Sequence, residues 1–304
     1  MKLGFVSAIL DGWTFEEMMD TAAGLGYECV EAACWPQGKA ERRYAGVSHI
    51  DVDNDSRGYV AHIHETCKKT GVEISALAYY PNTMDGDFQK QEDAIRHLKK
   101  VIAFSEKLGI GMVTTFVGRD QTKSVEENLE AFGRIWPPII QYAEEHGVRI
   151  AIENCPMLFG EEQWPGGQNL MTTPPIWREV FKILDSDNLG INYDPSHFIW
   201  QMIDYIRPLY EFKDKIFHVH YKDIKIYKDK LESCGIMAYP LEYMSPKIPG
   251  LGDVDWGKYV SALTDIGYDG CTCIEIEDKA FEDSKEKVEK SLILSKRYLE
   301  KYVI

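Results

Sequence analysis

The sequence predicts an α/β fold, a single-domain (β/α)8 or TIM barrel over residues 1–304. Three observations lead to this fold class. Short apolar or β-branched runs alternate with longer amphipathic segments, glycine recurs where a helix should end, and every long connection follows a strand. Eight such units in order favour a parallel sheet, and eight strands are the number that closes as a barrel.

The expected strands are short runs rich in apolar, β-branched and aromatic residues. They lie at 3–7, 28–34, 73–79, 111–117, 149–154, 189–194, 216–221 and 271–277. The expected helices follow them at 14–25, 57–70, 88–108, 125–146, 174–185, 202–213, 256–266 and 280–302. Thr14 and Ser124 precede glutamates and are expected N-caps. Glycines that should end helices are Gly26, Gly71, Gly109, Gly147 and Gly267.

A doubly wound open sheet is the main competing architecture. It would usually show a glycine-rich turn after the first strand, where this chain reads SAILDGW. The long connections at about 34–56, 154–173 and 222–255 all follow strands. In a barrel they would lie on the C-terminal face, where active sites sit.

Composition narrows the class of protein. A net charge of −15 repels phosphate backbones and anionic membranes, so neither nucleic acid nor a membrane is an expected partner. The N-terminus lacks a signal-peptide pattern, and no apolar run reaches the roughly 18 residues of a spanning helix. Seven scattered cysteines without paired spacing favour a reducing, cytoplasmic compartment.

Four consecutive expected strands end in residues that can bind a metal ion: Glu153, Asp194, His220 and Glu275. Side chains alternate along a strand, so each of these residues shares a face with the residue two positions before it. If those faces point inward, three carboxylates and an imidazole converge. Carboxylates that meet without a cation repel one another and raise each other's pKa. We therefore expect one divalent ion there; three oxygens and one nitrogen suit Mn, Mg or Co, with Zn as an alternative.

The motifs around these residues resemble those of a known family. AIENCP (151–156), NYDPSH (192–197), HVHYKD (218–223), PGLGDVDW (249–256) and CIEIED (273–278) are similar to the sugar phosphate isomerase/epimerase branch of the xylose isomerase-like barrels, over essentially the whole chain. The resemblance implies that Glu153, Asp194, His220 and Glu275 bind the metal. It also implies that His197 contacts substrate oxygens.

Two positions depart from the ketose 3-epimerases of this family. They carry a further Glu six residues after the first metal-binding Glu, where this chain has Phe159. They also carry an Arg six residues after the metal-binding His, where this chain has Ile226. The AP endonuclease branch needs additional histidines near strands two to four, and these strands contain none. Both comparisons argue against a standard ketose 3-epimerase and against a DNA repair enzyme.

Further substrate contacts are expected on the same face. Lys222 follows the metal-binding His and could steady a developing oxyanion, although a surface lysine is an equal alternative. Trp35, Tyr80 and Trp164 could stack on a sugar ring or simply pack, and Asn82 could bind a hydroxyl. The loop after the last strand, EDKAFEDSKE, is acidic and without glycine, which favours an uncharged sugar or glycoside over a sugar phosphate.

Three functions follow from this constellation. The first is a metal-dependent isomerase or epimerase of carbohydrate metabolism, in which Glu153 and Glu275 move a proton next to a carbonyl through an enediolate. The second is a lyase or dehydratase acting on an oxidised sugar, a 3-oxo-glycoside or a cyclitol, because the same intermediate can eliminate a β-substituent. The third is a non-catalytic carbohydrate-binding barrel, which has no use for converging carboxylates. Aromatic residues on the long loops would also suit a homo-oligomer contact.

Overall fold

Parallel strands close into a ring in the computed structural model of the chain, which describes residues 1–38, 45–158 and 160–302. Around the ring the order is β1 (Lys2–Val6), β2 (Cys29–Ala33), β3 (Glu73–Ala78), β4 (Met112–Thr115), β5 (Arg149–Glu153), β6 (Leu189–Tyr193), β7 (Ile216–Tyr221) and β10 (Cys271–Ile274). Pairing of β10 with β1 closes the ring. The predicted barrel is confirmed, and the open-sheet alternative is excluded.

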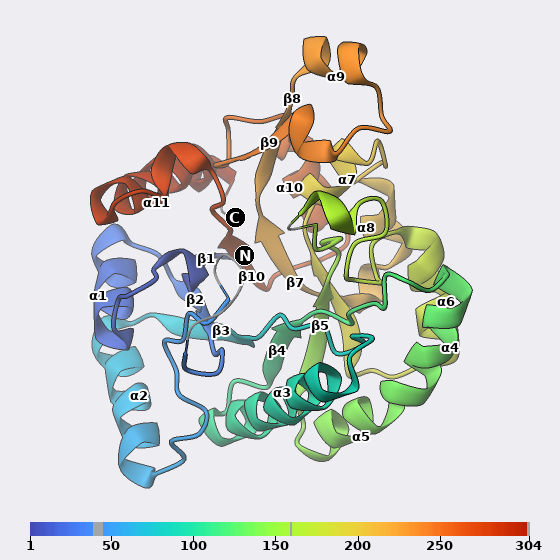
Figure 1. Ribbon diagram of the computed structural model, residues 1–304. Coiled ribbons are helices and arrows are strands. Elements are labelled where there is room, and N and C mark those ends of the chain that lie inside the picture. The colour runs from blue at the N-terminus through green and yellow to red at the C-terminus, as the bar shows by residue number, and fades with distance from the viewer. Residues whose placement is uncertain (39–44, 159, 303–304) are drawn as a thin grey trace.

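Helices surround the strands (Figure 1). They are α1 (Phe15–Leu25), α2 (Arg57–Thr70), α3 (Phe88–Leu108), α4 (Val125–Ile135), α5 (Pro137–Glu145), α6 (Pro174–Ile183), α7 (Ser196–Trp200), α8 (Arg207–Glu211), α10 (Trp256–Asp265) and α11 (Lys285–Leu299). Thr14 and Ser124 cap α1 and α4 in capping boxes, as predicted. Gly26, Gly71 and Gly109 end their helices in the left-handed conformation that glycine adopts without strain.

Two predicted helices differ in the structure. The single helix expected over 125–146 is divided into α4 and α5 at Trp136, because Pro137 and Pro138 cannot continue the hydrogen-bond ladder and start a new helix instead. In place of the helix expected over 202–213, the structure has two short helices: α7, which lies before that range, and α8, which lies within it. Pro195 occupies the N-cap position of the first and Pro208 lies in the first turn of the second, positions that the fixed φ of proline suits.

The connection at 222–255 holds an insert that the sequence pattern did not predict. Its strands β8 (Asp223–Ile226) and β9 (Met244–Lys247) pair antiparallel, and the helix α9 (Lys228–Cys234) lies between them. The insert protrudes from the barrel at the top of Figure 1. The Asp223 carboxylate fixes its base by accepting the backbone N–H groups of Ile224, Gly250, Gly252 and Val254 and the indole N–H of Trp256.

The core has two parts. Between strands and helices, apolar side chains pack around large buried rings such as Trp136, Trp177 and Trp256. Inside the ring, by contrast, buried polar side chains such as Glu31 and His218 lie among small ones. Buried polar groups must find partners, so this inner layer is where a site can be built. None of the described helices is long and apolar enough to cross a membrane.

Candidate metal centre

Four side chains converge at the C-terminal end of the barrel. Glu153 ends β5, Asp194 directly follows β6, His220 lies near the end of β7, and Glu275 directly follows β10. One ligand atom from each lies within 4.8 Å of the others. Glu153, Asp194 and His220 are buried, and the Glu275 side chain is 18% exposed. The structure therefore brings together the four residues that the strand pattern singled out.

The imidazole of His220 has one nitrogen toward this group and one away from it. Nδ1 lies 3.3 Å from Glu275 Oε2 and 3.8 Å from Glu153 Oε1. Nε2 lies 2.6 Å from Glu31 Oε2 on the inner side of the barrel. A proton on Nε2, donated to Glu31, leaves the lone pair of Nδ1 for a metal ion. A carboxylate behind a histidine is the usual way in which proteins fix the tautomer of a metal ligand.

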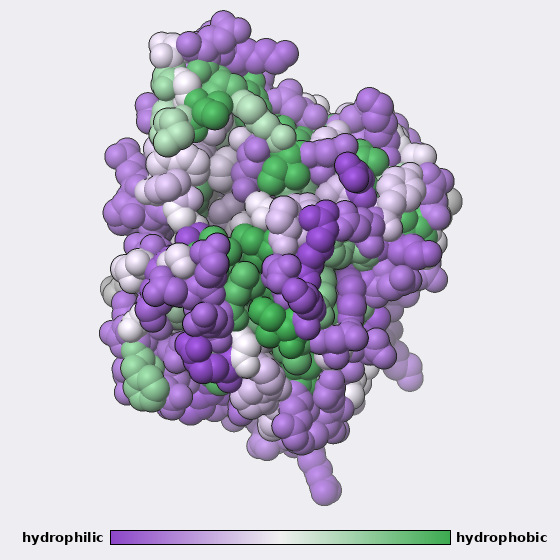
Figure 2. Space-filling view, turned by 90° about the vertical axis from the view of Figure 1, so that its right-hand side faces the viewer, coloured by the Kyte–Doolittle hydropathy of each residue, from purple (hydrophilic) through white to green (hydrophobic). Residues whose placement is uncertain are grey.

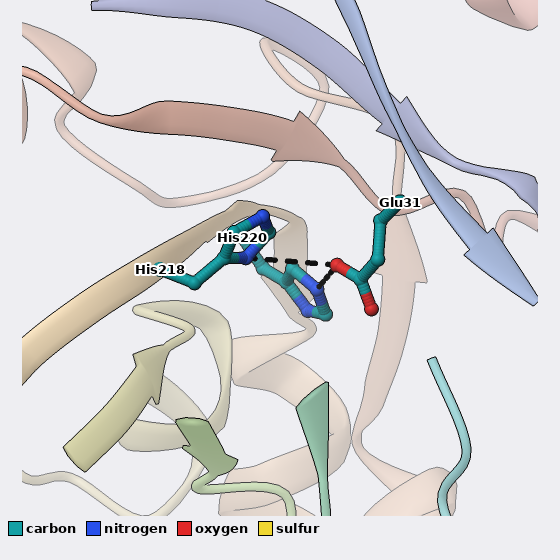
Figure 3. A group of neighbouring side chains, drawn as sticks. All are labelled: Glu31, His218 and His220. Carbon is teal, nitrogen blue, oxygen red and sulfur yellow. Dashed lines mark hydrogen bonds and ion pairs between the residues drawn. The ribbon is translucent and has the colours of Figure 1, made fainter. Parts of the chain in front are cut away.

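Glu31 is a functional candidate that the sequence analysis missed. It lies in β2, is fully buried, and approaches both His220 and His218 (Figure 3). Its other oxygen accepts hydrogen bonds from the Tyr80 hydroxyl at 2.5 Å and the Thr114 hydroxyl at 2.8 Å. Burial alone would raise the pKa of Glu31, but the two histidines and the Tyr80 hydroxyl outweigh it and lower that pKa to about 2. Glu31 is therefore a carboxylate that holds His220 in place.

The group fits a metal ion because three of its four residues have an inward atom without a hydrogen-bond partner. Asp194 Oδ2, His220 Nδ1 and Glu275 Oε2 are buried and make no hydrogen bond among the described residues. Buried polar atoms are almost always paired. Atoms of three different residues that face one point without hydrogen bonds are what a cation would satisfy. Glu31, His218 and His220 form a second group with ligand spacing, but protein hydrogen bonds already engage these three side chains.

The pKa values of the four residues are shifted by burial and by the charged side chains next to them. Burial raises the pKa of Glu153, but the contacts with His197 and His220 lower it to about 2. Burial and the negative charge of Glu153 leave the pKa of Glu275 raised, even though Lys222 lowers it. Burial lowers the pKa of His220, yet Glu31, Glu153 and Glu275 raise it well above its ordinary value. In the metal-free protein, protons on this imidazole thus offset part of the carboxylate charge.

Lys222 is a buried cation at the edge of the group. Only 3% of the residue is exposed, and its Nζ lies 3.3 Å from Glu275 Oε2 and 2.5 Å from Glu277 Oε2. Burial lowers the pKa of Lys222, but the two glutamates raise it well above its ordinary value. The surface-lysine alternative is thus wrong. Glu277, which the sequence analysis did not single out, shares this face of the chain with Glu275.

His197 completes the group from the first turn of α7. Its Nε2 lies 3.2 Å from Asp194 Oδ2 and 3.4 Å from Glu153 Oε1, and it makes no hydrogen bond of good geometry. Cys155 lies close enough to His197 and Glu153 for the three to form a further group with ligand spacing. His197 therefore faces the same point as the three atoms without hydrogen bonds, Asp194 Oδ2, His220 Nδ1 and Glu275 Oε2.

A cavity in two chambers opens above these residues. The inner chamber, about 80 Å³, reaches Glu153 and Glu275. The outer chamber, about 1030 Å³, reaches His197 and spreads over the loops. Lys222, Trp35 and Cys155 are among the residues that line both chambers. A molecule in the outer chamber can therefore extend a group toward the three atoms that make no hydrogen bond.

The other expected substrate contacts lie in different surroundings. Trp35 packs edge-on against Tyr79, with ring centroids 4.9 Å apart. Tyr80 lines the inner chamber, with its hydroxyl donating to Glu31. Asn82 lines the outer chamber, but its amide is already bonded to backbone groups of Arg119 and Met84.

Trp164 joins two loops. Its indole N–H donates to the Met237 carbonyl at 3.1 Å, and its ring lies 6.3 Å from that of Trp200, centroid to centroid. It is not among the residues that line the two chambers in the described part of the chain. Of the two departures from the ketose 3-epimerases, Ile226 ends β8, and Phe159 lies outside the described residues.

Comparisons with known proteins agree with this architecture. The family described as xylose isomerase-like TIM barrel matches residues 19–298. An inosose dehydratase of Clostridium perfringens is 27% identical over 303 residues, which cover 91% of this chain and 90% of that protein. The protein MJ1311 of Methanocaldococcus jannaschii is 31% identical over 164 residues, only 53% of this chain and 46% of that one.

Solved structures show the same fold. The IolI protein with a bound zinc atom superposes with a TM-score of 0.75 at 20% identity, covering 100% of this chain and 98% of that one. A D-psicose 3-epimerase of Clostridium cellulolyticum H10, solved with D-tagatose, gives a TM-score of 0.71 at 15% identity, covering 100% and 99% of the two chains.

Proposed function

The chain belongs to the xylose isomerase-like TIM barrel family, and from this premise we propose that it is a divalent-metal-dependent sugar isomerase or epimerase that transfers a proton next to a carbonyl. The observation that carries the proposal is the convergence of Glu153, Asp194, His220 and Glu275, three of them with an atom that makes no hydrogen bond, beside a cavity that reaches Glu153 and Glu275. A non-catalytic binding barrel has no use for three converging carboxylates, which repel one another.

Glu153, Asp194, His220 and Glu275 would hold the ion. Three oxygens and one nitrogen suit Mn, Mg or Co, and zinc, present in the IolI structure, is the alternative. When bound, a divalent ion supplies Lewis-acid polarisation of the substrate carbonyl.

The side chains supply the proton transfer. Glu153 and Glu275 come from strands on different sides of the ring, so one carboxylate can take the proton from the carbon next to the carbonyl and the other can return it. The Lys222 ammonium, beside Glu275, can donate a hydrogen bond to the enediolate oxygen as its charge develops. His197 is placed to contact a hydroxyl of the same sugar.

A lyase or dehydratase is the second candidate. Two observations favour it: Ile226 stands where ketose 3-epimerases carry an arginine, and an inosose dehydratase matches over 91% of this chain. The same residues would remove the proton, and a β-hydroxyl or aglycone would then leave in place of proton return. A reducing, cytoplasmic location belongs to the proposal, because each of the seven cysteines is a free thiol.

Proton NMR in D2O tests the proposal, with Mg²⁺ added and a panel of ketohexoses, aldoses and 3-oxo-glucosides. We expect deuterium to enter next to the carbonyl. An isomeric sugar as product indicates the isomerase or epimerase, and loss of water or aglycone indicates the lyase. Glu153→Gln should abolish the exchange, while Glu161→Gln, on an exposed residue of the following loop, should leave it unchanged. No exchange on the whole panel with metal bound would overturn the proposal.

A further inference from the structure

The outer chamber is larger than one sugar ring requires. At about 1030 Å³ it lies at the upper end of the roughly 300–1,000 Å³ of small-molecule pockets. The inner chamber alone reaches Glu153 and Glu275. A substrate that places its reacting carbons in the inner chamber therefore leaves most of the outer chamber to the rest of the molecule.

One wall of the outer chamber is apolar and comes from the insert. Tyr239, Pro240, Leu241 and Met244 line it, and Trp200 of α7 continues it. Leu241 is 44% exposed, and Ile236 and Met237 of the same insert are also exposed. Exposed apolar side chains that gather in one patch, unlike single ones, mark a binding surface. Figure 2 shows apolar surface gathered on the protruding upper part of the molecule, where the insert lies.

A second part of the chamber lining is polar. Asp85, Lys90 and Asp93, from the loop after β3 and the start of α3, line it. Hydroxyl groups suit such a wall, whereas an apolar ring does not. The lining of the outer chamber thus has an apolar part and a polar part.

The apolar wall is held in place without a ligand. At its base, Asp223 accepts five hydrogen bonds from the chain around it. Lys247 of β9 pairs with Asp278 at 3.2 Å, which ties the insert to the loop after β10. The Trp164 indole bonds to the Met237 carbonyl and ties the insert to the loop after β5. A preformed wall avoids the entropy of ordering a loop when a ligand binds.

We propose that this wall is a subsite for an apolar ring substituent, so that the substrate is an oxidised glycoside, with a ring carbonyl and an aryl or similar apolar aglycone, rather than a free sugar. The inference rests on the proposed function for the placement of the sugar. The aglycone lies along Tyr239, Leu241 and Trp200, and the sugar points to the inner chamber. Its hydroxyls can contact the Lys222 ammonium, which lines both chambers.

Matched glycosides test the subsite. Isothermal titration calorimetry on the full chain with Mn²⁺ compares the phenyl and methyl β-glycosides of glucose, galactose and mannose, which lack a carbonyl and so bind without reacting. Burial of the phenyl ring predicts roughly tenfold tighter binding of the phenyl member for at least one sugar. Equal affinities throughout, or no saturable binding of any phenyl glycoside, would overturn the proposal.

Two substitutions in the insert test whether the phenyl ring binds against this wall. Leu241→Ala should reduce the phenyl-over-methyl preference by about threefold or more, because it removes apolar surface from the wall. Met237→Ala is the matched control: Met237 lies on the same insert and is 78% exposed, but does not line the chamber. A preference that both variants leave unchanged, with wild-type melting temperatures, would place the phenyl ring elsewhere and overturn the subsite.

The subsite and the proposed function can be refuted independently of each other. Deuterium exchange on free ketoses without any phenyl preference would refute the subsite and leave the enzyme proposal intact. A phenyl preference that depends on Leu241, without exchange on any substrate, would refute the proton-transfer chemistry and leave the subsite.

Discussion

Replacing Glu31 by glutamine should weaken metal binding, although Glu31 is not one of the four proposed ligands. One Glu31 oxygen accepts from Tyr80 and Thr114, and the other accepts from His220 Nε2. Glutamine has only one acceptor oxygen. If that oxygen accepts from the Tyr80 and Thr114 hydroxyls, the amide N–H groups of the glutamine face His220 Nε2. Nε2 must then act as a hydrogen-bond acceptor. The imidazole proton moves to Nδ1, the atom that faces Glu153 and Glu275.

The magnitude follows from this change of tautomer. Loss of an outer carboxylate behind a ligating histidine typically lowers metal affinity about 10- to 100-fold, or about 1.4–2.7 kcal/mol. A competition titration of Mn²⁺ against a fluorescent chelator measures it. Glu28→Gln, the same change at an exposed position just before β2, should leave the affinity unchanged. Wild-type affinity in Glu31→Gln, with a wild-type melting temperature, would refute the argument that Glu31 fixes the tautomer.

Three further predictions concern protons and packing. Because nearby carboxylates raise the pKa of His220 well above 6.5 in the metal-free protein, metal binding at pH 7 should release a proton; equal calorimetric enthalpies in buffers of different ionisation enthalpy would contradict this. Gly252→Ala should lower the free energy of unfolding by about 1–3 kcal/mol in urea, because a Cβ would lie 2.2 Å from Asp223 Oδ1, whereas Gly58→Ala, with open space around it, should not destabilise the protein. Burial lowers the pKa of His49 to about 4, so its contribution to stability is complete above pH 6.5 and is lost as the pH falls toward 4. The fall in the free energy of unfolding over that range should be about 2–3 kcal/mol smaller in His49→Asn, and an identical pH dependence would show that His49 does not titrate in this way.

The strand pattern was sufficient to predict the barrel and to bring four distant residues together. In a parallel barrel all strands end on the same face, so Glu153, Asp194, His220 and Glu275 meet once their strands are placed. Alternation along each strand then identifies which side chains point inward. Neither step needs knowledge of the loops, which is why both succeed without a structure.

Glu31 could have been found by the same reasoning. It is the charged residue within CVEAA, the buried strand β2, and a charge inside a buried strand requires partners. Its pairing with His220 could not be predicted, because it depends on which inward side chains face one another across the ring.

The insert could not be predicted for a different reason. Its strands β8 and β9 are only four residues long each, and they pair across a long connection. Short strands with little alternation give a weak sequence signal. The division between α4 and α5, in contrast, was readable from Pro137 and Pro138, because proline lacks the N–H that a continuing helix needs.

The most direct test of the central claim is the position of a metal ion. Anomalous diffraction from crystals grown with Mn²⁺ should show one strong peak among Glu153, Asp194, Glu275 and the Nδ1 side of His220. A peak on the Nε2 side of that ring, between Glu31 and His218, would contradict the proposed ligand set. No peak at either place, from protein saturated with Mn²⁺, would contradict the metal centre itself.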